Sequence, residues 1–294
     1  AEIIMEGAYY NGQYLNRLER LGYSQAEIDN KLESTFEEMF YGPEGVRLCH
    51  FAGSDMMYIE DTGNHDVRTE GMSYAMMFCV QMNRQKEFDC LWRWVVTHMY
   101  LTEGENAGYF AWSCHTDGSK NSDGPAPDGE EFFAMSLFFA ANRWGSGEGV
   151  LDYASWARRI LHACVHKGEE AGSGFPMWNP ENHLIKFIPN CEFTDPSYHL
   201  PHFYELFALW SDECDRPFWH AAAAASRQYL RKACHARTGL SAEYAEYDGR
   251  PHRGDQPDRH DWFFSDAYRT LGNIALDAQW FGDKDGWAQE TAAH

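Results

Sequence analysis

The sequence lacks the patterns that mark several common functional classes. No run of 18 apolar residues occurs, so nothing in it predicts a membrane-spanning helix. The sequence contains no Ser-His-Asp pattern, no phosphate-binding loop and no dinucleotide fingerprint. Cys-x-x-Cys pairs are also missing, and several of the eight cysteines lie in apolar helical runs. We therefore expect free thiols in a reducing compartment rather than disulfides.

Positive charge is scarce as well. The 294 residues include 24 Lys and Arg against 45 Asp and Glu, which gives a formal net charge of −21. Such a field repels nucleic-acid phosphates and anionic lipids, so we expect neither as a partner, whereas a neutral sugar is unaffected. The first residues also lack the basic start and apolar stretch of a signal peptide. Together with free thiols, this predicts a cytoplasmic protein.

Long segments with helical periodicity dominate what is present, and strand patterns are sparse. The chain therefore reads as a single all-α domain over residues 1–294. Eight helices are expected, at about 24–40, 70–82, 86–101, 129–143, 152–167, 197–211, 215–234 and 265–281.

These helices alternate in character. The even-numbered ones are apolar on most sides and the odd ones carry a charged face, which predicts inner helices wrapped by outer ones. Short links follow the even helices and long ones follow the odd helices, at about 41–69, 102–128, 168–196 and 235–264. Because short links force antiparallel neighbours, the inner helices should run parallel and the long loops should meet at their N-terminal rim. A repeating hairpin of this kind is typical of a solenoid or toroid.

Four polar side chains open the four expected inner helices: Glu70, Asp128, Tyr198 and Asp266. If the inner helices form a ring, these groups converge on one rim. Each also has a structural interpretation: acidic residues favour the first turn of any helix, and Tyr198 taken alone is most often a packed ring with its hydroxyl satisfied. Asp128 taken alone is an N-cap, with Glu131 completing a capping box.

Carboxylates that face a groove surrounded by aromatic loops suit glycoside hydrolysis. One carboxyl group must be protonated to protonate the leaving oxygen, and another must be ionised to activate water or attack carbon. Glu70 is backed by apolar residues and faces Asp128, so we expect a raised pKa and the role of acid. Asp266 would stay ionised as the base.

The segments TEGMSYAMM, YFAWSC, DGSKNSDGPAPDGEE, FTDPSYHLPHFYELFALW and FFSDAYR together resemble glycoside hydrolase family 8. The resemblance runs from about residue 6 to about residue 287, and it is strongest to the exo-acting members that release xylose from the reducing end of xylo-oligosaccharides. It implies an (α/α)6 toroid, an inverting mechanism, a β-1,4-xylo-oligosaccharide substrate and no cofactor or metal.

The resemblance also implies a role for each site residue. Glu70 matches the general acid and Asp266 the general base, whose carboxyl groups should lie roughly 6.5–9.5 Å apart in an inverting enzyme. Asp128 matches the aspartate that holds the distorted sugar, and Tyr198 the tyrosine that helps to position the attacking water. Trp112 resembles a stacking platform for the sugar, with a core tryptophan as the alternative.

Eight helices fall short of the twelve that the toroid needs, so we expect an incomplete ring. The loop that enforces exo action in the family would lie in the missing part. An endo-acting xylanase, glucanase or chitosanase therefore stays open, as does a catalytically silent sugar-binding toroid. A sugar epimerase on a similar toroid is a weaker alternative.

Two groups of histidines could suggest a metal site. His162 and His166 lie four residues apart on an expected outer helix, and we interpret them as surface histidines. Asp195, His199 and His202 lie near the expected rim, where we predict capping and hydrogen bonds to sugar hydroxyls rather than metal binding.

Overall fold

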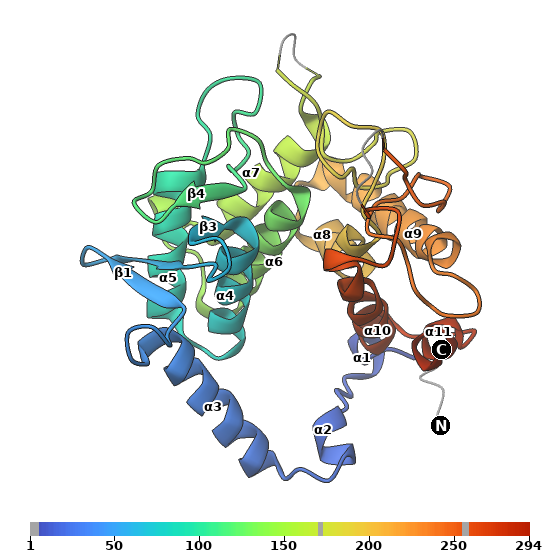
Figure 1. The fold of residues 1–294 in the computed structure, drawn as a ribbon, viewed down its shortest axis with the longest axis horizontal. Helices are drawn as coiled ribbons and strands as arrows, with labels where there is room; N and C mark the ends of the chain where they lie inside the picture. Colours follow the sequence, from blue (N-terminus) through green and yellow to red (C-terminus); the bar gives the residue numbers. More distant parts are fainter. Residues whose placement is uncertain (1–5, 170–172, 255–258) are drawn as a thin grey trace.

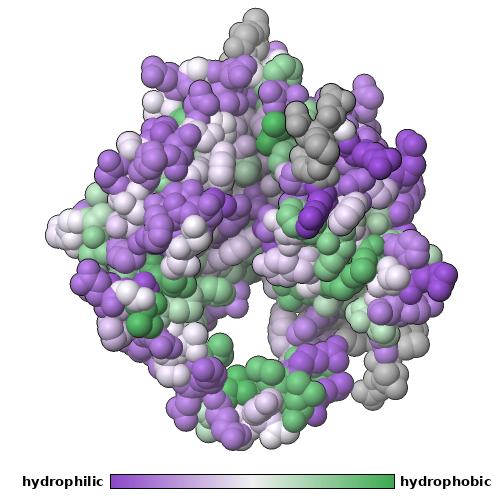
Figure 2. All heavy atoms as spheres, viewed as in Figure 1, coloured by the Kyte–Doolittle hydropathy of each residue, from purple (hydrophilic) through white to green (hydrophobic). Residues whose placement is uncertain are grey.

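Helical hairpins make up most of the structure. The computed structural model describes residues 6–169, 173–254 and 259–294, and its helices surround a central opening (Figures 1 and 2). Its α-helices are α1 (Ala8–Asn11), α2 (Arg17–Arg20), α3 (Gln25–Tyr41), α4 (Thr69–Gln81), α5 (Gln85–Trp94), α6 (Pro127–Trp144), α7 (Tyr153–His166), α8 (Pro201–Trp210), α9 (Arg216–Ala233), α10 (Arg269–Phe281) and α11 (Trp287–Ala293).

The expected order of inner and outer helices is confirmed. Helices α4, α6, α8 and α10 pack against one another in sequence, and each also packs against the helix that follows it, from α5 to α11. The ribbon shows this arc continuing through α1, α2 and α3, which curve back toward α4 and α5 (Figure 1). A mostly α-helical toroid-type architecture results, with the inner helices side by side.

The helix bounds differ from expectation mainly where proline or a tighter turn intervenes. The expected helix 86–101 ends as an α-helix at Trp94 and continues as the π-helical turn η1 (Val95–Met99). The expected helix 197–211 is divided into the 3-10 turn η3 (Pro196–Tyr198) and α8. Pro201 begins α8 because its fixed φ and missing N–H suit the first helical position.

Three more 3-10 segments precede helices of the described chain. They are η2 (Gly149–Leu151) before α7, η4 (Glu213–Asp215) before α9 and η5 (Ser265–Tyr268) before α10.

The expected start of α3 is confirmed in detail. The Ser24 hydroxyl accepts from the Glu27 N–H, and the Glu27 carboxylate accepts from the Ser24 N–H, which forms the capping box.

Four short strands lie in the long loops. Strands β1 (Cys49–Ala52) and β2 (Met56–Ile59) form an antiparallel hairpin in which Cys49 pairs with Ile59. Strands β3 (Asp66–Arg68) and β4 (Ser113–His115) are also antiparallel, with Asp66 opposite His115. The second pair matters for the site, because β3 runs directly into α4.

Two hydrophobic clusters stabilise the described chain. The main one runs from α3 to the end of α10 and contains large fully buried rings such as Trp92, Phe133 and Trp219. A smaller one, centred on Tyr229, Leu230 and Ile274, joins α9, α10 and α11. All eight cysteines are free thiols, as expected. Among the described residues, no helix is both long and apolar enough to cross a bilayer.

Candidate active site

Glu70 owes its position to the β3–β4 pair. The backbone N–H of Thr69 donates to the carbonyl of Trp112 at 3.0 Å, which extends the strand pairing into the first turn of α4. Glu70 follows at once, in the first turn of a helix whose other side chains are mostly buried. The sheet therefore fixes both the start of α4 and the place of Trp112 beside it.

A glycine allows α4 and α6 to meet at their N-terminal ends. A Cβ placed on Gly129 would lie only 2.5 Å from the Cβ of Thr69, so no larger residue fits without movement. Glu70 directly follows Thr69 in α4, and Asp128 directly precedes Gly129 in α6. The close approach at Gly129 therefore brings these two carboxyl groups to the same place.

Asp128 is not the N-cap that the sequence suggested. Helix α6 begins one residue earlier, at Pro127, with Ala126 as its N-cap, so Asp128 lies inside the first turn. Proline suits the first helical position because it has no backbone N–H that needs a hydrogen-bond partner there, and α6 starts without a side-chain cap. The predicted capping box with Glu131 is also wrong, because the Glu131 carboxylate is buried and accepts a hydrogen bond from the Tyr204 hydroxyl.

Arg269, the first residue of α10, links a carboxylate of α6 to one of the preceding turn η5. Its Nη1 donates to Asp128 Oδ2 at 3.0 Å and to the Tyr74 hydroxyl at 2.6 Å. Its Nη2 lies 3.1 Å from Oδ2 of Asp266, three residues earlier in the chain. Asp128 and Asp266 thus share one guanidinium, although Asp128 is only 3% exposed and Asp266 is 46% exposed. The predicted convergence on one rim follows from these contacts.

Burial and the charges of Asp128, Arg269 and Asp266 all act on the pKa of Glu70. Burial raises the pKa of Glu70 to about 8, and the charge of Asp128 adds to this effect. Arg269 opposes the shift, and Asp266 adds a smaller upward contribution to the pKa. Burial also raises the pKa of Asp128, against the lowering effect of Arg269. At neutral pH the site therefore holds a protonated carboxyl group at Glu70.

Tyr198 belongs to the same cluster. It lies in η3, is 5% exposed, and has the Arg269 guanidinium 5.8 Å from its ring centre. Burial, followed by the charges of Asp128 and Asp195, raises the pKa of the Tyr198 hydroxyl well above its usual value. The phenol therefore stays protonated and can donate a hydrogen bond.

Trp112 is half-buried, which fits neither a fully packed core residue nor a free surface ring. The guanidinium of Arg68 lies 5.2 Å from the ring centre, and Arg68 in turn pairs with Asp61 and Asp66. The indole also lines a pocket of about 310 Å³, together with Pro125, Phe175, Pro189 and other loop residues. Trp112 can therefore present apolar surface to a ligand in the loops.

The second histidine group does not face a ligand. Asp195 caps η3 by accepting from the Ser197 N–H at 2.7 Å, as expected. His199 is fully buried between Thr194 and Ser226, and His202 is 1% exposed. The prediction that these side chains bind sugar hydroxyls is wrong in this structure, because helix packing removes both rings from the surface.

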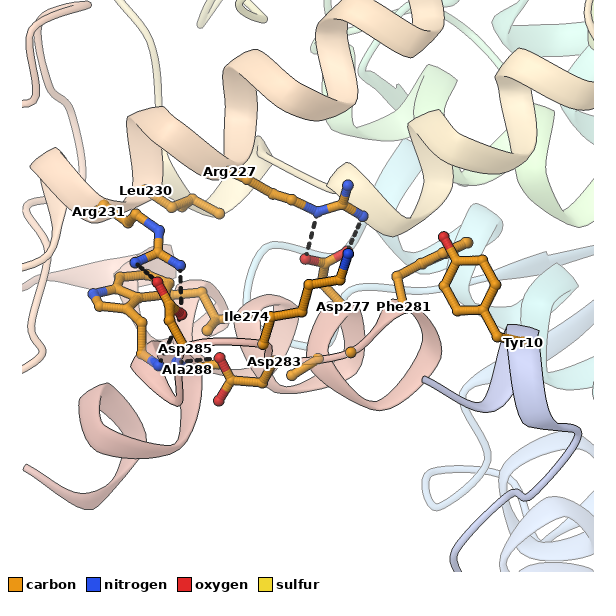
Figure 3. Close-up of a pocket in the computed structure, with 14 residues that line it drawn as sticks. Tyr10, Arg227, Leu230, Arg231, Ile274, Asp277, Phe281, Asp283, Asp285 and Ala288 are labelled. Carbon is orange, nitrogen blue, oxygen red and sulfur yellow. Dashed lines mark hydrogen bonds and ion pairs between the residues drawn. The ribbon is translucent and has the colours of Figure 1, made fainter. Parts of the chain in front are cut away.

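Other cavities lie away from the carboxylates. A cavity of about 400 Å³ lies among α1, α9, α10 and α11, where Arg227 pairs with Asp277 and Arg231 with Asp285 (Figure 3). Both arginines in this cavity are therefore already matched with an aspartate. A pocket of about 370 Å³ is instead lined by Asp128 and Arg269, together with aromatic and apolar residues of the inner helices.

The sequence reasoning missed Arg269 and Gly129, although both lie in segments that it singled out. Arg269 is the one cation within residues 265–281, and a single basic residue three positions after Asp266 was a usable signal. Gly129 carried no signal of its own, because a close helix approach depends on the partner helix.

Comparison with known proteins identifies the family. The family model described as Glycosyl hydrolases family 8 matches residues 23–293. This chain belongs to glycosyl hydrolases family 8. It is therefore a glycoside hydrolase, and the fold class expected from its helical pattern is the one its family shares.

Close relatives of this family 8 chain carry related names. The chain is 56% identical over 286 residues to a reducing end xylose-releasing exo-oligoxylanase of Halalkalibacterium halodurans, covering 97% of this chain and 73% of the relative. It is 57% identical over 286 residues to the enzyme Rex8A of Paenibacillus barcinonensis, covering 96% and 74%. A solved structure of Rex8A complexed with xylose superimposes with a TM-score of 0.94, covering 97% of this chain and 75% of that one.

Proposed function

We propose that this chain hydrolyses β-1,4-xylo-oligosaccharides with inversion and releases xylose from their reducing end. The observation that carries the proposal is the pairing of a protonated carboxyl group at Glu70 with an exposed carboxylate at Asp266. An inverting glycosidase needs one acid and one base of this kind. The names of the relatives that are 56–57% identical to the chain support the choice of xylo-oligosaccharides.

Glu70 acts as the general acid in this proposal. Its pKa of about 8 keeps the proton available at neutral pH, and the cause is burial reinforced by the charge of Asp128. Protonation of the glycosidic oxygen lets the reducing-end sugar leave. The resulting Glu70 carboxylate is then stabilised by Arg269.

Asp266 acts as the general base. Its exposure gives room for a water molecule, and the ion pair with Arg269 orients the carboxylate. Arg269 also holds Asp128, which we assign to holding the distorted sugar ring. The protonated hydroxyl of Tyr198 is suited to hold the attacking water, and Trp112 to stack against a sugar in the loops.

The experiment that tests this proposal uses xylotriose labelled with ¹³C at C1 of the reducing end. We expect labelled xylose and unlabelled xylobiose, and proton NMR should show α-xylobiose before mutarotation because inversion of a β-linkage yields the α-anomer. Glu70→Ala and Asp266→Ala should each abolish release while the circular dichroism spectrum stays unchanged.

Three outcomes would contradict the proposal. Unlabelled xylose would mean cleavage from the other end, and initial β-xylobiose would mean retention. Saturable xylobiose binding with no sugar released over a long incubation would indicate a sugar-binding protein instead. Faster cleavage of cello-oligomers or chitosan than of xylotriose would move the substrate preference to another polysaccharide.

We also propose a cytoplasmic location, in which the enzyme trims imported oligosaccharides. Eight free thiols, six of them buried, support a reducing compartment. Fractionation of the source cells with an antibody against the chain tests this, and recovery in the culture medium would contradict it.

A further inference from the structure

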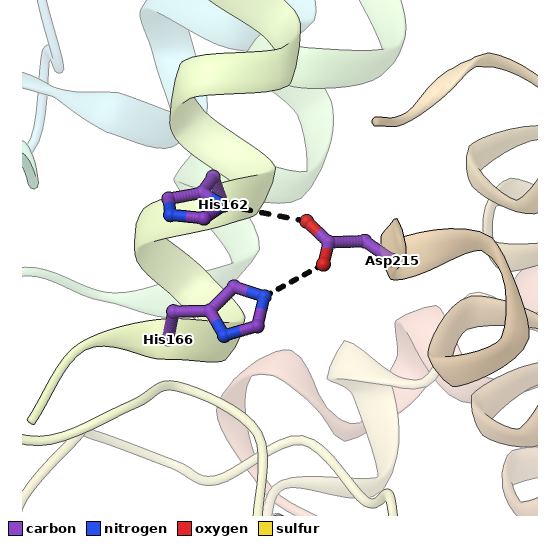
Figure 4. Close-up of side chains that lie close together, drawn as sticks. All are labelled: His162, His166 and Asp215. Atoms are coloured by element: carbon purple, nitrogen blue, oxygen red, sulfur yellow. Dashed lines mark hydrogen bonds and ion pairs between the residues drawn. The ribbon is translucent and has the colours of Figure 1, made fainter. Parts of the chain in front are cut away.

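Two histidines and an aspartate meet on the outer side of the ring. His162 and His166 lie on α7, and Asp215 ends η4, directly before α9 (Figure 4). His166 Nε2 lies 2.6 Å from Asp215 Oδ1, and His162 Nδ1 lies 3.5 Å from Asp215 Oδ2. All three potential ligand atoms fall within 4.8 Å of one another. One carboxylate therefore faces two imidazoles from a neighbouring element.

Asp215 is unusual for an outer residue because it is only 2% exposed. Its Oδ1 accepts from His166, but its Oδ2 is buried without any hydrogen-bond partner among the described residues. A buried carboxylate oxygen without a partner is costly, so something should satisfy it. That oxygen is the one nearest His162, on the side from which solvent can enter, because the His162 side chain is 56% exposed.

The second ring nitrogen of His166 also contacts a carboxylate. Its Nδ1 lies 2.7 Å from Glu169 Oε1, so the ring is fixed between two carboxylates. Histidines that bind metals very often pair their other ring nitrogen with a carboxylate in this way, which orients the ring and increases its basicity. Glu169 thus supplies a supporting contact outside the three potential ligands.

We propose that His162, His166 and Asp215 bind a divalent transition metal ion such as Zn²⁺. Two imidazole nitrogens and one carboxylate oxygen suit zinc and its neighbours, whereas Mg²⁺ and Ca²⁺ prefer oxygen ligands alone. Bond lengths of about 2.0–2.2 Å place tetrahedral ligand atoms roughly 3.3 Å apart, so only small side-chain shifts are needed. The exposed side leaves a fourth position for water.

Bound metal would join two outer helices. It would tie the C-terminal end of α7 to the start of α9, which belong to successive hairpins. Arg158 already crosses the same boundary, through a hydrogen bond from its Nε to the Trp210 carbonyl at 3.0 Å. The site is therefore structural, separate from the carboxylates at the inner rim.

Isothermal titration of the full chain with Zn²⁺, after EDTA treatment and dialysis, tests the proposal. We expect one saturable site, and binding of Zn²⁺ at about 100 times its dissociation constant should raise the melting temperature by about 5 °C. His162→Ala and His166→Ala should weaken binding at least tenfold, and Glu169→Gln by about tenfold. Mg²⁺ should give no heat of binding at the same concentrations.

Two controls keep the result interpretable. His220→Ala removes an exposed histidine on α9 that lies outside the proposed site and should leave Zn²⁺ affinity unchanged. Cys214→Ser removes the exposed thiol next to Asp215 and should do the same. Absence of saturable binding by the wild type overturns the proposal. Loss of binding in Cys214→Ser with retention in His162→Ala and His166→Ala also overturns it, because the ion would then belong to the thiol.

Discussion

The inner helices α6 and α10 bring acidic side chains to the same site, but they are held in different ways. Twelve of the 18 residues of α6 are buried, against three of the 13 in α10. Helix α6 lies in the main hydrophobic cluster, whereas α10 depends partly on the smaller cluster around Ile274. Asp128 is accordingly almost inaccessible and Asp266 is half-exposed.

This difference suits the chemistry that we propose. On the α4–α6 side, tight packing removes water and raises the pKa of Glu70, so that side can hold a proton. On the α10 side, the carboxylate of Asp266 keeps access to water and is oriented by the guanidinium of Arg269. Packing therefore sets the pKa of the acid, Glu70, and a polar contact sets the orientation of the base, Asp266.

Glu70→Gln tests the acid side and should have the largest effect. The amide keeps the shape but has no proton to give, so we expect turnover of xylotriose to fall about 10³-fold with little change in KM. In the wild type, turnover should decline above about pH 8, where Glu70 loses its proton. Retention of that decline and near wild-type turnover in Glu70→Gln would contradict the assignment.

The same variant has a signature in stability. The folded pKa of Glu70 lies above the ordinary value of 4.5, so its contribution to the free energy of unfolding is complete below about pH 4.5 and is lost as pH rises through about 8. Glutamine does not titrate. The melting temperature of Glu70→Gln should therefore rise relative to that of the wild type between pH 5 and pH 9. A constant difference in melting temperature would mean that the pKa of Glu70 is ordinary.

Matched truncations compare the packing of the two helices directly. Phe133→Ala in α6 removes a fully buried ring and should lower the free energy of unfolding by about 3–5 kcal/mol. Leu276→Ala in α10 removes a side chain that is 36% exposed and should cost less than about 1 kcal/mol. Urea unfolding measures both, and equal losses would show that α10 is packed as tightly as α6.

Arg269→Lys tests the polar contact on the α10 side. A lysine has one compact charge and cannot reach both Asp128 and Asp266 as the guanidinium does. We expect kcat to fall about 10- to 100-fold with little change in KM, because Asp266 loses its orienting partner. A variant with near wild-type kcat would reduce Arg269 to a stabilising residue.

Arg227→Lys provides the matched control. Arg227 of α9 also bridges two carboxylates, Glu205 of α8 and Asp277 of α10, but neither belongs to the proposed active site. The Arg227→Lys variant should have a lower melting temperature than the wild type and a kcat close to it. A similar loss of kcat in both variants would show that the effect comes from general destabilisation.

Most of the fold could be predicted because its signals are local. Apolar periodicity and the alternation of short and long links predicted inner and outer helices, and the parallel inner helices placed Glu70, Asp128 and Asp266 on one rim. Helix ends were less predictable where tertiary contacts decide them. The early start of α6 at Pro127 and the break before Pro201 are examples.

Contacts between distant segments could not be predicted from single patterns. The partner of His162 and His166 is Asp215, about fifty residues away, and no spacing rule connects them. The burial of His199 and His202 likewise depends on how α8 packs against α9. The raised pKa of Glu70 was predicted from its apolar helix and from Asp128, but the close approach of Gly129 to Thr69, which brings the two hairpins together, was not.

Gly129→Ala tests the contact that makes the acid side compact and should have the smallest effect. Alanine favours a helix interior over glycine by about 1 kcal/mol, so α6 itself would gain stability. Its Cβ would meet Thr69 at 2.5 Å, and α4 must move away to relieve the contact. We expect kcat to fall about tenfold and the decline above pH 8 to shift to lower pH, because greater separation from Asp128 and better hydration lower the pKa of Glu70. Gly129→Ala combined with Thr69→Gly, which removes the Cβ, hydroxyl and methyl group that the new Cβ would meet, should recover part of the loss, and no recovery would place the effect elsewhere.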